Sequence, residues 1–88
     1  MSQYSIQVVS NITGIGVHTL RAWEKRYKAV VPERSENGRR MYKDSDVEKL
    51  KLLAELCSIG NQIGTIANLS IEELKKAHTY WLNKYMDS

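Results

Sequence analysis

The chain has 88 residues, of which 42% are hydrophobic and 26% are charged, and its formal net charge at neutral pH is +3. A chain of this length makes one small domain that buries roughly 60–65% of its unfolded surface, which argues against a second lobe or a deep active site. The single cysteine, Cys57, excludes an internal disulfide and a thiolate cluster for zinc. Because the sequence shows neither an export signal nor an apolar run long enough for a bilayer, we expect a cytoplasmic protein.

Positive charge is concentrated in one stretch of the chain. Between His18 and Lys43 there are eight Lys or Arg residues against three Glu, a local charge of +5, so the rest of the chain sums to −2. Such a concentration is typical of a surface that binds a polyanion, nucleic acid above all.

The first two predicted helices are short and joined by a glycine-containing turn. Residues 6–12 have apolar side chains at helical spacing, and Gly14 is a natural left-handed stop. Residues 17–27 form a second helix with an apolar side and a cationic side. The predicted inner residues are Val8, Val9 and Ile12, then Val17, Leu20, Trp23 and Tyr27, whereas the outer side of the second helix carries His18, Arg21, Ala22 and Lys25.

A hairpin follows the second helix, which we expect to end before Pro32 because the residue that precedes a proline is pushed out of the helical region. Asn37-Gly38 is the strongest short hairpin signal, since both residues tolerate the positive φ that a tight primed turn requires. Two strands at about 33–35 and 40–42 should flank this turn.

The remainder of the chain is predicted to be helical. Asp44-Ser45-Asp46 offers the cap of a third helix that runs to Gly60, residues 62–69 form a fourth, and Ser70 with Glu73 is a capping box for a fifth. Residues 1–88 are therefore expected to be a single, mainly α domain: a winged helix-turn-helix with about five helices and a two-stranded β-hairpin wing. The apolar stripe of the fifth helix is Ile71, Leu74, Ala77, Trp81 and Tyr85.

The helix-turn-helix at residues 7–27 would present the start of its second helix to the major groove of DNA. Arg21 can bond both acceptors on a guanine edge, and Thr19, near a helix N-terminus, can hold a phosphate. His18 and Lys25 share this face. The alternative is a helical hairpin whose basic face is merely solvated.

The hairpin at residues 34–42 is the second candidate contact. Arg39 and Arg40 lie on alternate faces, so one can follow the phosphate backbone or enter a minor groove while the other pairs with a Glu or a phosphate. Tyr42 can pack its ring on the domain and direct its hydroxyl at a phosphate. The alternative is a structural wing with solvated arginines.

Together these residues resemble the winged-helix domain of the MerR family of transcription regulators. The resemblance covers roughly residues 4–70 and lies in Thr19-Leu20-Arg21, Glu24-Lys25-Arg26 and, in the hairpin, Asn37-Gly38-Arg39-Arg40-Met41-Tyr42. Residues 22–27 and 63–74 look most like the subgroup of cobalamin-binding, light-regulated repressors of carotenoid synthesis. Two departures stand out: most members have an aromatic residue at Arg39, and Tyr where this chain has Ala22 and Trp23.

The resemblance implies individual roles and partners. Arg21 and His18 would reach the major groove, Thr19 and Tyr42 would touch phosphates, and the wing would use Asn37, Arg39 and Arg40. The function so implied is sequence-specific binding of double-stranded DNA by a transcriptional regulator, most simply a repressor. We expect the chain to be the N-terminal part of a longer, oligomeric regulator whose effector domain, with any cobalamin, lies outside it, and the isolated domain to be a monomer. An acidic antirepressor protein is a further possible partner.

Other classes of function find less support. We see no catalytic constellation and expect no enzyme activity, and neither His18 nor His78 has the carboxylate or cysteine neighbours of a metal ligand. We expect no cofactor within this chain. Two alternatives to a regulator remain, an architectural DNA-bending factor like an excisionase and a protein-interaction module without a DNA role.

Overall fold

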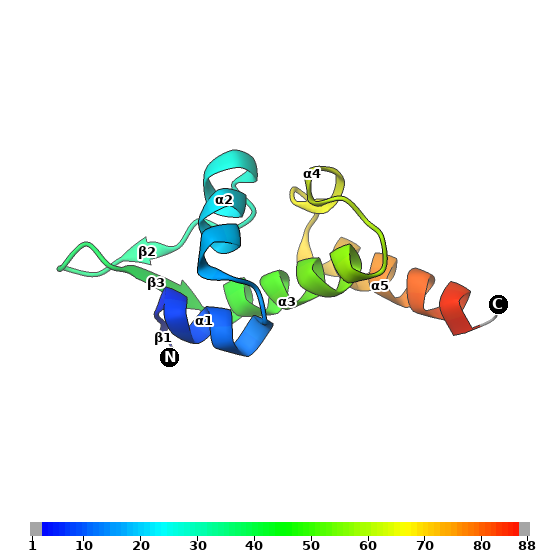
Figure 1. Ribbon diagram of the computed structural model, residues 1–88, viewed down its shortest axis with the longest axis horizontal. Helices are drawn as coiled ribbons and strands as arrows, with labels where there is room; N and C mark the ends of the chain where they lie inside the picture. The colour runs from blue at the N-terminus through cyan, green and yellow to red at the C-terminus, as the bar shows by residue number, and fades with distance from the viewer. Residues whose placement is uncertain (1–2, 87–88) are drawn as a thin grey trace.

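The computed structural model describes residues 3–86, with side chains described through residue 84. In Figure 1, α2 and α4 rise on one side of α3, while the hairpin extends from one end of the molecule and α5 from the other. The elements in chain order are β1 (Gln3–Tyr4), α1 (Ile6–Thr13), α2 (Val17–Tyr27), β2 (Glu33–Arg34), β3 (Arg40–Lys43), α3 (Asp44–Ser58), α4 (Ile63–Ile66) and α5 (Ile71–Met86). This confirms the predicted mainly α architecture, with five helices in the described part of the chain.

The sheet has one strand more than the sequence predicted. Its order is β1-β3-β2 and both pairings are antiparallel, with Tyr4 opposite Tyr42 and Arg34 opposite Arg40. A two-residue strand is too short to show an alternating pattern, which is why β1 escaped sequence analysis. Its effect is to tie the start of the chain to the inner strand of the hairpin.

The turn of the hairpin differs from the predicted one. Gly38 has a φ of 77°, but Asn37 does not adopt a positive φ, so the prediction of a primed turn with two such residues was wrong. The Gly38 N–H donates to the Ser35 carbonyl at 2.9 Å, and the Ser35 N–H donates to the Arg39 carbonyl at 2.8 Å. These bonds form a turn followed by a left-handed glycine, the usual arrangement of a three-residue hairpin loop.

The two helices of the helix-turn-helix have sharp ends. The Ser5 hydroxyl caps α1 by accepting from the Val8 N–H, and Gly14 ends it with a φ of 77° as predicted. The bounds of α2 match the prediction: the helix ends at Tyr27, and its C-cap is Lys28, a left-handed residue with φ of 51° that lies four residues before Pro32. A local backbone reversal therefore ends α2, not the proline.

Burial on α1 is narrower than expected. Val9 is buried, but Val8 and Ile12 are exposed, so the predicted inner face was wrong for these two residues. The helix instead directs Ile6, Val9 and Thr13 inward, a spacing of three and four residues. Although α1 contacts α2, α3 and β3, it buries only this narrow stripe.

The hydrophobic core centres on α3, which packs against α1, α4, α5 and the sheet. Its buried residues lie on one stripe, whereas Ala54 and Cys57 are only half-buried. Burial raises the pKa of the Cys57 thiol. The residues of α3 that are buried are Val47, Leu50, Leu53 and Leu56.

The second half of the chain closes the base of the domain. The capping box of α5 is confirmed: the Ser70 hydroxyl accepts from the Glu73 N–H at 3.2 Å, and the Glu73 carboxylate accepts from the Ser70 N–H at 3.0 Å. Leu74 is buried and Ala77 and Trp81 are half-buried against the core, as the predicted stripe requires, while the side chain of Tyr85 lies outside the described ones. The fourth helix is shorter than predicted.

Candidate nucleic-acid interface

Helix α2 is held by its apolar side and leaves its polar side free. Leu20 is buried, and Trp23 and Tyr27 are half-buried against the core. Ala22 is half-buried as well, so it is not the open outer position that the sequence suggested. The residues that face solvent from α2 include His18, Thr19, Arg21 and Lys25, all four of the predicted contact residues on this helix.

A single carboxylate joins α2 to the hairpin. The Arg40 Nε donates to Glu24 Oε1 at 2.9 Å, and the Tyr42 hydroxyl donates to Glu24 Oε2 at 2.8 Å. Both oxygens of Glu24 are thus bonded to residues of β3, and the Arg40 and Glu24 side chains are only 29% and 16% exposed. This arrangement fixes the hairpin relative to α2.

The electrostatics of the three groups agree with this geometry. The hydrogen bond that Arg40 donates to Glu24 raises the pKa of Arg40, and burial together with the same carboxylate raises the pKa of Tyr42. Arg40 therefore stays charged and Tyr42 stays protonated throughout the physiological range. Charged hydrogen bonds out of water are among the stronger ones in proteins.

Tyr42 does not have the role that the sequence suggested. Its ring packs into the core as expected, but the whole side chain is 0% exposed and its hydroxyl is bonded to Glu24. The predicted contact of this hydroxyl with a phosphate is therefore corrected: Tyr42 supports the interface from inside.

Arg39 and Arg40 of the hairpin differ in burial, as successive residues of an extended chain do when one of its faces is covered. Arg40 is half-buried and pairs with Glu24, whereas Arg39 is exposed. The sequence suggested that one of them pairs with a Glu or a phosphate, and in the structure Arg40 pairs with Glu24. The hairpin tip is stiffened by Arg34, whose guanidinium donates to the Gly38 carbonyl at 3.1 Å.

Three of the predicted residues meet in a groove. An open recess of 380 Å³ is lined by residues 5–7 at the start of α1, by Arg21 of α2, and by Gly38, Arg39 and Arg40 of the hairpin. His18, Thr19, Lys25 and Asn37 are exposed and do not line it. Of the predicted contact residues, His18, Thr19 and Lys25 therefore lie on the outer face of α2 and Asn37 lies in the hairpin turn. The three arginines line the groove, and Tyr42 is buried.

Sequence reasoning missed two parts of this interface. Glu24 was noted only as part of a motif, although an acidic residue within a cationic helix is itself a signal that a partner cation lies nearby. Ser5 and Gln7 line the groove through the fold alone, since α1 begins beside the hairpin only because β1 pairs with β3.

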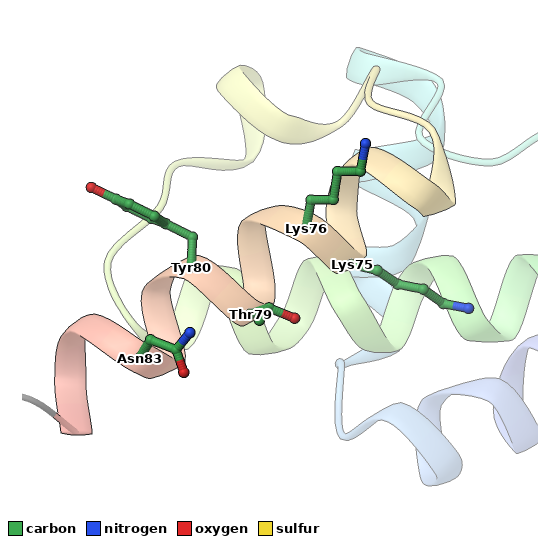
Figure 2. Close-up of a pocket in the computed structure, with 5 residues that line it drawn as sticks. All are labelled: Lys75, Lys76, Thr79, Tyr80 and Asn83. Atoms are coloured by element: carbon green, nitrogen blue, oxygen red, sulfur yellow. The ribbon is translucent and has the colours of Figure 1, made fainter.

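A second hollow lies on α5, away from these residues. It has a volume of 410 Å³ and all its lining residues come from one helix, and Figure 2 shows Lys75 and Tyr80 extending from α5 in opposite directions. Polar groups that diverge in this way do not hold a ligand, so the larger hollow is not the better candidate site. The lining residues are Lys75, Lys76, Thr79, Tyr80 and Asn83.

Other kinds of site find no support in the described part of the chain. Within residues 3–86, no three His, Cys, Asp or Glu side chains gather as metal ligands would. His78 is half-buried and pairs with Glu55 across the contact between α3 and α5. None of the described helices has the length and apolarity needed to cross a membrane.

Comparison with known proteins adds to this geometry. The profile of the family described as "MerR HTH family regulatory protein" matches residues 4–76. The HTH-type transcriptional repressor CarH of Myxococcus xanthus is 39% identical over 66 residues, which are 75% of this chain but only 22% of CarH.

Two solved structures share the fold. A MerR-family transcriptional regulator from Bacillus cereus superposes with a TM-score of 0.70 at 18% identity, over 98% of this chain and 69% of that one. HiNmlR, a MerR-family regulator that lacks the sensor domain and was crystallised bound to promoter DNA, superposes with a TM-score of 0.55 at 23% identity, over 98% of this chain and 80% of its own.

Proposed function

Because the chain belongs to the MerR HTH family of regulatory proteins, we propose that it binds double-stranded DNA as the DNA-binding domain of a transcriptional regulator, with α2 in the major groove and the β2–β3 hairpin as wing. The observation that carries the proposal is the Glu24 carboxylate, which bonds Arg40 and Tyr42 and so holds helix and hairpin together as one basic surface. A helix and a wing in fixed relation grip a duplex at two adjacent places.

Two relatives support this function. HiNmlR has the same fold and was crystallised on promoter DNA, and CarH is a transcriptional repressor. We propose repression as the mode of action on the likeness to CarH. The chain spans only 22% of the length of CarH, so this likeness concerns the DNA-binding domain and not the signal that governs the whole regulator. Cobalamin binding stays a prediction about chain beyond these residues.

The exposed residues of α2 would make the direct contacts. His18 and Thr19 lie at the start of the helix, the part that enters the major groove in helix-turn-helix proteins, and Lys25 follows two turns later on the same polar side. We assign base contacts to His18 and phosphate contacts to Thr19 and Lys25, with Asn37 at the tip of the wing.

We further propose that the isolated domain is a monomer that acts in the cytoplasm. Leu74, Ala77 and Trp81 of the α5 stripe pack against the core, and so these residues are not available to a second copy. An acidic protein that imitates DNA could compete for the basic surface of α2 and the hairpin. Sedimentation equilibrium at tens of micromolar tests the first point, because a tight dimer would show that α5 is an interface.

The function is tested by selecting duplexes from a random pool and measuring their affinity against that of unselected duplex. We expect a recovered consensus, tighter binding to it, and loss of that preference in His18→Ala. Lys76→Ala serves as the control, since Lys76 is an exposed cation on α5. Failure to enrich any sequence, together with no affinity for duplex, would overturn the proposal.

A further inference from the structure

The groove between α1, α2 and the hairpin is strongly cationic. Arg21, Arg39 and Arg40 line it, and none of its lining residues is acidic. Glu24, the one carboxylate of α2, has both oxygens engaged by Arg40 and Tyr42. Two exposed guanidinium groups, those of Arg21 and Arg39, are therefore left facing solvent at the groove.

The start of α1 adds hydrogen-bond donors to the same recess. The Ser5 hydroxyl accepts from the Val8 N–H, and the first turn contains no acidic residue. Ile6 and Gln7 are the first two residues of α1, and the first N–H groups of a helix have no carbonyl acceptor within that helix. Both residues line the groove. The partial positive charge at the N-terminus of α1 therefore adds to the charge of the arginines in attracting an anion.

The shape of the groove selects among the parts of a duplex. Base edges lie on the floor of the major groove, about 8.5 Å below its rim, so only side chains that project outward from a helix reach them. Arg21 lines a recess between three elements, and what enters a recess in the protein is the part of DNA that projects, its phosphate backbone. A volume of 380 Å³ accommodates one phosphate group with its nearest waters, since a water takes up about 30 Å³.

We propose that this groove holds one backbone phosphate of the bound duplex, with Arg21 and Arg39 as its charged ligands and the start of α1 as its neutral donors. The inference rests on the proposed function and deepens it. It also revises the sequence-based assignment of Arg21, which becomes a phosphate ligand in place of a reader of guanine. Arg40 is a positioning residue here, because Glu24 holds its Nε.

The decisive experiment pairs protein variants with modified DNA. A series of duplexes, each with one phosphate replaced by an uncharged methylphosphonate, is titrated with the wild-type domain, Arg21→Ala and the control Lys76→Ala. At one position the uncharged linkage should weaken binding by the wild type and by Lys76→Ala roughly ten-fold or more, the scale of a lost charged hydrogen bond, and should weaken Arg21→Ala by a clearly smaller factor, because only Arg39 and the α1 donors remain at that position. Equal losses for all three proteins at every position would overturn the proposal.

A second measurement separates phosphate binding from base reading. Arg21→Ala and Arg39→Ala should each weaken binding to selected and unselected duplexes by the same factor and reduce the salt slope by about one. The double variant should lose less than the product of the two single losses, because both side chains serve one phosphate. A loss for Arg21→Ala confined to the selected sequence, with the salt slope unchanged, would show that Arg21 reads a base.

Inorganic phosphate distinguishes the source of the ligand. Titration with inorganic phosphate should cause saturable shifts of the Ile6 and Gln7 amide resonances in the wild type and none in Arg21→Ala. These shifts should occur together with the methylphosphonate coupling, that is, the dependence of the methylphosphonate effect on Arg21. Such shifts without that coupling would mean that the groove takes free phosphate only, and would overturn the proposal. A wild-type domain that binds duplex with the expected salt dependence but shows no coupling leaves the proposed function intact, whereas one that does not bind duplex refutes both.

Discussion

The α2–hairpin face and the α3–α5 base are both crossed by ion pairs, yet the pairs differ in kind. Glu24 and Arg40 are 16% and 29% exposed, and Glu24 accepts a second bond from buried Tyr42, whereas Glu48 and Lys75 are 50% and 60% exposed and have no such additional bond. Exposed pairs contribute little to stability, while groups removed from water depend on their partners. An ion pair between a carboxylate and a cation therefore positions the hairpin on the α2–hairpin face and contributes little to the stability of the α3–α5 base.

The two regions also obtain their stability from different sources. The base contains the buried leucines of α3 and Leu74 of α5, so hydrophobic packing holds it. The face carries a local excess of +5 between His18 and Lys43, which tends to push its elements apart. Glu24 counteracts this repulsion at the point where α2 meets β3.

The largest effect is expected from breaking the base. Leu74→Ala should lower the free energy of unfolding by about 2–5 kcal/mol, because Leu74 is fully buried between α5 and α3 and its loss leaves a cavity. Urea denaturation followed by circular dichroism measures it. Leu82→Ala is the matched control, since Leu82 is 41% exposed on the same helix and should change stability by less than about 0.5 kcal/mol. Equal effects would contradict the described core.

Removing the carboxylate of the face should rank second. Glu24→Ala leaves a half-buried guanidinium and a buried hydroxyl without their acceptor, so we expect a loss of about 2–3 kcal/mol, against less than about 1 kcal/mol for Glu48→Ala. Affinity for a selected duplex should fall in Glu24→Ala even though the surface becomes more positive. A rise in affinity would show that charge alone matters and that the positioning of the hairpin does not.

Tyr42→Phe should have a smaller effect, about 1.5 kcal/mol, because it removes one hydrogen bond to a charged group. It should also change how the free energy of unfolding falls at alkaline pH. Since the pKa of Tyr42 is raised in the folded state, unfolded chains lose this proton first, and stability falls as pH rises above about 10, the ordinary pKa of tyrosine. Denaturation at pH 8 and pH 11 should show a smaller alkaline loss for Tyr42→Phe than for the wild type.

The smallest expected effect is at the cap of α5. Ser70→Ala removes the hydroxyl that accepts from the Glu73 N–H and should cost about 1 kcal/mol. Because Ser70 belongs to the base, duplex affinity measured well below the unfolding midpoint should not change. A reduced affinity in folded Ser70→Ala would show that base and face are coupled more closely than their contacts indicate.

The sequence predicted the regular elements well and the supporting contacts poorly. The bounds of α2, the Gly14 stop and the Ser70–Glu73 capping box follow from local rules, and the structure confirms them. The burial of Val8 and Ile12 was misjudged because periodicity identifies an apolar side without showing how much of it a neighbour covers.

The site was predicted as a set of residues but not as an arrangement. His18, Thr19 and Arg39 are exposed where expected. The partners of Glu24 lie 16 and 18 residues away in the chain, and only the folded sheet shows that it holds Arg40 and Tyr42. Nothing local to Tyr42 separates a residue that supports the interface from one that contacts a ligand.

If α2 and the hairpin form one basic surface for duplex DNA, affinity should depend steeply on salt concentration. If this surface neutralises about five phosphates, log affinity against log salt should fall with a slope between about −4 and −5 for the wild type. Lys76→Ala should share that slope. A slope near zero on selected and unselected duplexes alike would contradict the account.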